Sequence, residues 1–300
     1  MKKMNIALFT AAAMIGSTAA IADDHVEGPN LHGRIQTVLI DEDSAANENL
    51  EMNSWHIAAS GSASDLLGGI DASYYSRLSN AYVTGDPDTD RDVGVEYGFV
   101  AFDFGGAELT LGRDDDLNYY FAESMIFANQ PRAYTGIGGA AFNNGDGVKL
   151  TSDFGGSPIT VGAYAADKES TGVEETQVAV SADLGMGTVA AVYSDNDYDN
   201  TYTELTTVAA SFDFGVATVA GRIADLESGE NPWTIVAGIP FDANTTIYAI
   251  HGSDDGVVAN GQTEDDSSTG LEVRTVLGGG LEAFVGLTRG EDGDGTSADS

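Results

Sequence analysis

The residues best suited to chemistry in this sequence are carboxylates, and they gather in one long polar stretch. Asp114, Asp115 and Asp116 follow one another directly, and Glu123 comes soon after them. A run of carboxylates can hold a cation at a defined metal site, or it can attract cations through the electric field of a channel wall. Whether these carboxylates form a metal site or a charged channel wall depends on the structural elements that position them.

Sequence signatures of metal sites and hydrolases are incomplete in this chain. The stretch from Asp195 begins like a calcium-binding EF-hand loop, but Asn200 stands where glycine is needed and Thr206 where glutamate is needed. The 4 histidines lack the spacing of metal ligands, and no G-x-S-x-G nucleophile elbow occurs. We therefore expect no metal, no cofactor and no enzymatic activity.

The segments around the carboxylates alternate between apolar and polar residues, as β-strands with two different faces do. Leu271 and Val273, for example, alternate with Glu272 and Arg274. The connections between such segments alternate between short glycine-rich turns and longer polar loops. This pattern predicts an up-and-down antiparallel meander of about fifteen strands between residues 31 and 289.

The charges on the polar faces favour a membrane barrel over a soluble sandwich or solenoid. Arg34, Arg77 and Arg274 lie opposite the apolar faces of their strands. Guanidinium groups could not fill a dry core without partners, whereas they suit a water-filled lumen whose outer face contacts lipid. The fold class we predict is therefore all-β, a transmembrane antiparallel up-and-down β-barrel.

Aromatic residues next to the short turns support the same interpretation. The phrase FDFGGAELTLGR recurs in variant forms along the chain, with phenylalanines just before or within the turn. A membrane barrel carries such a girdle at the lipid–water interface, although phenylalanine in a soluble β protein could also be ordinary core. The predicted girdle residues are Phe102, Phe104, Phe154, Phe212, Phe214 and Phe241.

The N-terminus and the composition indicate an exported envelope protein. Residues 1–22 have a basic start, a short apolar segment and an A-x-A site, which together predict a signal peptide. The chain has no cysteine, so no disulfide stabilises it. With 12 basic and 48 acidic residues its net charge is -36, which argues against binding to nucleic acid. The remainder, 23–300, forms the predicted barrel.

With its signal, meander and one exceptional loop, the chain resembles the general porins of Gram-negative outer membranes, and among these the alphaproteobacterial type. The resemblance implies a homotrimer of 16-stranded barrels in the cell outer membrane, surrounded by lipid, that passes ions and small hydrophilic solutes by passive diffusion. Because our strand count is odd and the chain ends in a polar segment, we expect the last strand to be missing from this sequence, unless one strand is miscounted.

The resemblance also implies where solutes are filtered. The segment 114–145, the longest predicted connection, corresponds to a third loop that folds into the lumen and narrows it. Arg113, Asp114, Asp115, Asp116 and Glu123 would then form the pore constriction, facing a basic pore wall of Arg34, Arg77 and Arg274. With so few basic residues, we expect a cation-preferring channel. The alternative is a plugged or adhesive outer-membrane barrel without general channel activity.

Overall fold

The computed structural model describes residues 10–13, 26–40, 49–66, 69–79, 94–127, 144–168, 173–196, 204–226, 231–253, 267–278, 281–291 and 297–299. The elements are β1 (Thr10–Ala13), β2 (Val26–Ile40), β3 (Asn49–Leu66), β4 (Ile70–Ser79), β5 (Gly94–Asp103), β6 (Ala107–Asp115), the π-helix η1 (Tyr119–Glu123), α1 (Ser124–Phe127), β7 (Asn144–Ser152), β8 (Ile159–Lys168), β9 (Val173–Asp183), β10 (Gly187–Asn196), β11 (Glu204–Asp213), β12 (Thr218–Leu226), β13 (Trp233–Pro240), β14 (Thr245–Ser253), β15 (Ser267–Gly278), β16 (Leu281–Glu291) and β17 (Ser297–Asp299).

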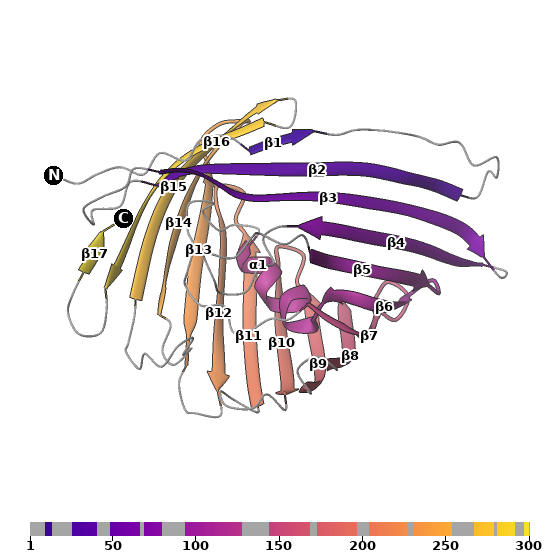
Figure 1. The fold of residues 1–300 in the computed structure, drawn as a ribbon. Helices are drawn as coiled ribbons and strands as arrows, with labels where there is room; N and C mark the ends of the chain where they lie inside the picture. Colours follow the sequence, from indigo (N-terminus) through magenta and orange to yellow (C-terminus); the bar gives the residue numbers. More distant parts are fainter. Residues whose placement is uncertain are drawn as a thin grey trace.

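Strands β2 to β16 form one antiparallel up-and-down sheet, in which each strand pairs with the next along the chain. Figure 1 shows this sheet curving around the helical segments η1 and α1. The predicted all-β meander is confirmed, and its strands match β2 to β16 in order. The strands before and after this meander, β1 and β17, were not predicted.

The first and last strands of the meander are bridged by the short strand β1. Within the described residues, β16 and β2 do not pair with each other. Instead Thr10 and Ala11 pair with Glu282 and Leu281 of β16, while β1 also pairs with β2. The short strand β17 pairs with β16. Apart from β1, the predicted signal peptide lies outside the described residues.

The two faces of the sheet differ in the sense expected of a membrane barrel. On β15 the apolar side chains of Leu271 and Val273 are exposed, whereas Glu272 and Arg274 between them are buried. The same holds on β7, where Val148 is exposed on the outer face and its neighbour Lys149 is buried on the inner face. An apolar exterior around a polar interior is stable where lipid surrounds the sheet.

A repeated aspartate–x–glycine turn explains the recurring sequence phrase. The Oδ1 atom of an aspartate accepts a hydrogen bond from the amide of the glycine two residues later, at 2.7–2.9 Å. Each glycine has a positive φ, between 76° and 82°, which a side chain would disfavour. The turns are those at Asp103, Asp153, Asp183 and Asp213.

The helical residues form a small inner element rather than a layer of their own. Within the described part of the chain, neither helix has the length and apolar composition needed to cross a membrane. Both follow directly from β6, and they pack on the inner face of the sheet against β9 to β13. We call residues 116–127 the inner loop.

Candidate functional site

The inner loop is held against the sheet by a small apolar contact area. Leu117, Phe121 and Ala122 are buried, and they pack against a patch of mostly small side chains from β8 to β11. Ile126 packs farther along, on β12 to β14. Small residues on the sheet leave room for a helical turn inside the curve, which larger side chains would fill.

A glycine on β8 makes the closest approach between the loop and the sheet. A Cβ added at Gly162 would lie 2.8 Å from Leu117 Cδ2 and 2.9 Å from Phe121 Cε2. Real Cβ atoms do not approach other heavy atoms so closely, so a side chain here would force the tips of the Leu117 and Phe121 side chains to move. The close packing of Leu117 and Phe121 on β8 therefore uses the space left by the missing side chain of Gly162.

A buried glutamine on β9 anchors the start of the inner loop. The Oε1 atom of Gln177 accepts hydrogen bonds from the amides of Leu117 (2.7 Å) and Asn118 (3.1 Å). Its Nε2 donates to Asp116 Oδ2 at 3.1 Å and to Glu175 Oε1 at 2.7 Å. One side chain thus satisfies two backbone donors at the helix start, which would otherwise lack an acceptor in a buried position.

Two ion pairs hold the inner loop, and the end of β6 just before it, against the sheet. Lys149 of β7 contacts the carboxylate of Asp114, and Arg222 of β12 contacts the carboxylate of Glu123. Burial raises the pKa of Glu123 to about 7, although the neighbouring Arg222 guanidinium opposes the rise. Burial thus favours the protonated form of Glu123, whereas the contact with Arg222 favours the charged form.

The structure separates the predicted constriction residues into different environments. Asp116 and Glu123 are fully buried against the sheet, and Asp114 is paired with Lys149.

The two remaining members of the constriction set have their own partners. The Nε atom of Arg113 lies 3.4 Å from Asp146 Oδ1. Asp115 accepts a hydrogen bond of 2.6 Å from the hydroxyl of Tyr97. The rest of the predicted constriction loop, 128–143, lies outside the described residues.

The predicted basic wall lies on strands other than those that hold the inner loop. The guanidinium of Arg77, on β4, lies 4.3 Å from the ring centre of Tyr97. Arg274, on β15, is buried and donates to Glu272 Oε1 at 2.9 Å and 3.0 Å. Arg34 pairs with His56 in the β2–β3 ladder, and its side chain is outside the described part. The structure thus does not bring the three arginines into one described cluster.

The predicted aromatic girdle residues lie at or beside the short turns at one end of the sheet. Phe104, Phe154, Phe214 and Phe241 are strongly exposed, and the rings of Phe212 and Phe214 are 6.3 Å apart. Large apolar side chains exposed at the ends of strands are suited to the interfacial region of a bilayer. Their role as a girdle stays a prediction.

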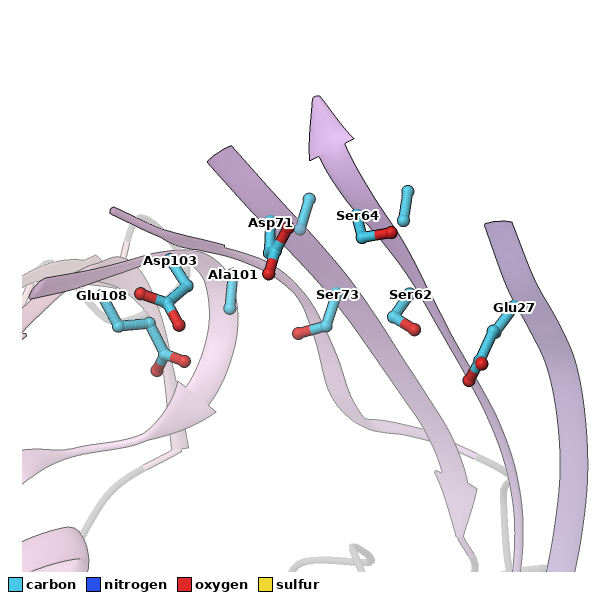
Figure 2. A pocket seen from close by; sticks show the side chains of 10 residues that line it. Glu27, Ser62, Ser64, Asp71, Ser73, Ala101, Asp103 and Glu108 are labelled. Carbon is cyan, nitrogen blue, oxygen red and sulfur yellow. The ribbon is translucent and has the colours of Figure 1, made fainter. Parts of the chain in front are cut away.

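An acidic cavity that the sequence analysis did not identify lies on the inner face of β2 to β6. Its volume is about 380 Å³, and its lining residues come from β2 to β6. Figure 2 shows the carboxylates and hydroxyls among them. The polar lining residues are Glu27, Ser62, Ser64, Asp71, Ser73, Asp103 and Glu108.

The acidic cavity could have been found in part from the sequence. The sequence places three of its carboxylates on the polar faces of their strands and next to short turns: Asp71, Asp103 and Glu108. This position beside the turns could have indicated that they lie at the same end of the sheet. Throughout the described residues, no three His, Cys, Asp or Glu side chains are placed to hold one metal ion. The cavity therefore offers a negative field rather than a preformed metal site.

Comparison of the sequence with known families gives one match. A sequence model of the family described as Gram-negative porin matches residues 8–295 of this chain. A search of curated proteins gives no match.

Solved structures show the same fold at low sequence identity. A variant of the Rh. blastica porin is similar with a TM-score of 0.64 and 16% identity, covering 91% of this chain and 97% of that chain. OmpT, an outer membrane protein of Vibrio cholerae in its trimer form, is similar with a TM-score of 0.66 and 13% identity, covering 92% and 95%.

Proposed function

The chain belongs to the Gram-negative porin family, and from this we propose that it forms a water-filled channel for passive diffusion of ions and small hydrophilic solutes, with a preference for cations. The channel acts by size and charge, without a cofactor. We place it in the outer membrane, after export by the signal peptide 1–22, as a homotrimer. The trimeric form of the similar Vibrio cholerae protein supports the last point.

The preference for cations is supported by how the inner charges are paired. Three basic side chains on the inner face are buried and in contact with a carboxylate: Lys149 with Asp114, Arg222 with Glu123, and Arg274 with Glu272. These bases have little contact with water in the lumen, so they attract anions weakly. The pairing of these three inner bases with carboxylates is the observation that carries the proposal, and a fourth inner base, Arg77, lies against the ring of Tyr97.

Accessible carboxylates line the acidic cavity on β2 to β6. Glu27, Asp71 and Asp103 are exposed, and they line the acidic cavity together with Glu108. A cluster of one sign beside a low-dielectric wall raises the local concentration of counter-ions. These residues set the sign of the selectivity, and the inner loop, with Arg113, Asp114 and Asp115 at its root, narrows the path.

Single-channel recording in a planar bilayer tests the proposal. We expect stepwise conductance, and under a gradient of KCl a reversal potential that shows cation preference. The double variant Asp71→Asn, Asp103→Asn removes two exposed charges and reduces this preference. The control Asp146→Asn removes one exposed charge outside the cavity and leaves it nearly unchanged.

The possible outcomes separate the parts of the proposal. Conductance with anion preference would contradict the role given to the acidic cavity while the channel itself remained. Folded protein without conductance would support the plugged or adhesive barrel instead. Heat-modifiable migration on a gel, folded against boiled, shows that the protein in each recording is a barrel.

A further inference from the structure

Four aromatic side chains form a continuous strip on β2 to β5. The ring of Tyr75 lies 5.9 Å from His32, 6.0 Å from Tyr97 and 5.8 Å from Phe99, measured between ring centres. We call His32, Tyr75, Tyr97 and Phe99 the aromatic strip. Rings at these separations contact one another and present a connected apolar surface with electron-rich faces.

The aromatic strip lies on the inner face of the sheet. Tyr75 and Phe99 are direct partners in the β4–β5 ladder. Their chain neighbours Tyr74 and Val100 are exposed on the outer face, at 38% and 40%. Since side chains alternate between the faces of a strand, Tyr75 and Phe99 point inward.

The aromatic strip adjoins the acidic cavity directly. Ser73 and Ala101, which line the cavity, form the next inward pair of the same ladder after Tyr75 and Phe99. Two residues along a strand span about 7 Å, so the rings border the cavity on the side toward the inner loop. At the far end of the aromatic strip, Tyr97 donates its hydrogen bond to Asp115, at the root of that loop.

One ring of the aromatic strip already binds a cation of the protein itself. The guanidinium carbon of Arg77 is 4.3 Å from the ring centre of Tyr97, a cation–π contact. The neighbouring rings of Tyr75 and Phe99 carry the same kind of electron density on the wall of the same channel. Organic cations use such faces well, because their charge is diffuse and their methyl groups also gain from apolar contact.

We propose that the aromatic strip and the acidic cavity together form a subsite for small organic cations of the quaternary ammonium class. The carboxylates of Asp71, Asp103 and Glu108 attract cations into the cavity. The rings of Tyr75 and Phe99, about 13 Å along the strands from Asp71 and Asp103, supply the apolar platform at its edge. Potassium retains its hydration shell, so, unlike an organic cation, it passes the subsite without contacting the faces of the rings. This inference rests on the proposed channel function and adds a substrate class to it.

The test measures block of potassium current by choline. Full-length protein is reconstituted in a planar bilayer in KCl, and choline is added until the current falls by half. In the double variant Tyr75→Leu, Phe99→Leu we expect the half-blocking concentration to rise about five- to tenfold, from the usual strength of cation–π contacts. The potassium conductance itself is expected to remain, since leucine keeps the wall apolar.

Two controls make the result specific. Phe104→Leu removes a ring at an exposed turn and should leave the block unchanged. The uncharged analogue 3,3-dimethyl-1-butanol has the shape of choline without its charge, and we expect it to block at least fivefold more weakly. Equal block by the two compounds, or a block that survives loss of both rings, would overturn the inference.

The experiments distinguish an error in the proposed channel function from an error in the proposed subsite. If folded wild-type protein carries no current, the proposed function fails, and choline binding is then measured by equilibrium dialysis of the detergent-folded protein. Binding that weakens in the Tyr75→Leu, Phe99→Leu variant would still support the subsite, and equal binding by both proteins would refute it. If the double variant does not show heat-modifiable folding, Phe99→Leu alone replaces it.

Discussion

Replacing Glu123 by glutamine should release the inner loop from the sheet. Glutamine has nearly the shape of glutamate, so the packing of η1 changes little. The variant leaves the Arg222 guanidinium buried without the carboxylate that it contacts, at a site where the two side chains are 3% and 1% exposed. Arginine does not give up its proton in proteins, so the cost cannot be avoided by neutralisation.

The size of the effect follows from the burial of this pair. Removing one partner of a buried ion pair costs about 3–5 kcal/mol, and because a glutamine oxygen still accepts a hydrogen bond we expect about 3 kcal/mol. That corresponds to about a hundredfold shift of the loop from its seat on the sheet toward an undocked state. The measurement is made at pH 8, because burial raises the pKa of Glu123 to about 7 and the pair must be charged.

The converse variant should be milder, and this asymmetry is a second check on the argument. In Arg222→Met the remaining carboxyl can take up a proton, which neutralises the buried group. We therefore expect less undocking than in Glu123→Gln. The double variant Glu123→Leu, Arg222→Met removes both charges and should be close to wild type, since apolar replacement of a buried pair is often neutral or stabilising.

The assay records current levels and stability on the same preparations. Wild-type channels should show one main level of single-channel current. Glu123→Gln channels should show additional current levels when the inner loop detaches from the sheet. Denaturant unfolding of each variant gives the change in the free energy of unfolding.

The matched control is the exposed pair Arg113–Asp146, at 3.4 Å with side chains 32% and 70% exposed. Asp146→Asn should cost no more than about 1 kcal/mol. If Glu123→Gln behaves like Asp146→Asn, burial does not govern the seat of the loop and the reasoning is refuted.

Three further variants test the seat and the turns. Gly162→Leu should displace the inner loop and alter conductance, whereas Gly221→Ala, where a Cβ meets nothing closer than 3.4 Å, should leave current levels unchanged. Gln177→Leu leaves two buried loop amides without their acceptor, so denaturant unfolding should show a loss of about 2–4 kcal/mol, and a loss below 1 kcal/mol would contradict the anchor. Asp213→Ala removes the acceptor of the Gly215 amide in one exposed turn, and hydrogen exchange of that amide should speed up while conductance stays unchanged.

The strands and their two faces could be predicted from sequence because both are local properties. Alternation has a period of two residues, so Leu271 and Glu272 reveal their opposite faces without knowledge of any other strand. The turns are local as well, since Asp103 and Gly105 bond to each other two residues apart. The choice of a lipid-facing exterior followed from charges on the inner faces, and the exposed apolar residues agree with it.

The site depended on contacts between distant parts of the chain, which alternation does not encode. The loop carboxylates were expected to face the channel, yet Asp116 and Glu123 are buried because partners 61 and 99 residues away, Gln177 and Arg222, meet them on the inner face. The residues next to Asp116 and Glu123 in the sequence do not reveal whether these carboxylates face the channel or are buried against the sheet.

The acidic cavity and the aromatic strip likewise required the register of several strands. Asp71 and Asp103 are each ordinary polar-face residues, and only the ladder of β4 and β5 makes them direct partners. The sequence by itself determined which residues face inward, because one strand suffices for that. Tertiary structure decided which of them meet, which charges are buried, and which remain exposed to a passing ion, because these depend on pairing and packing across the whole sheet.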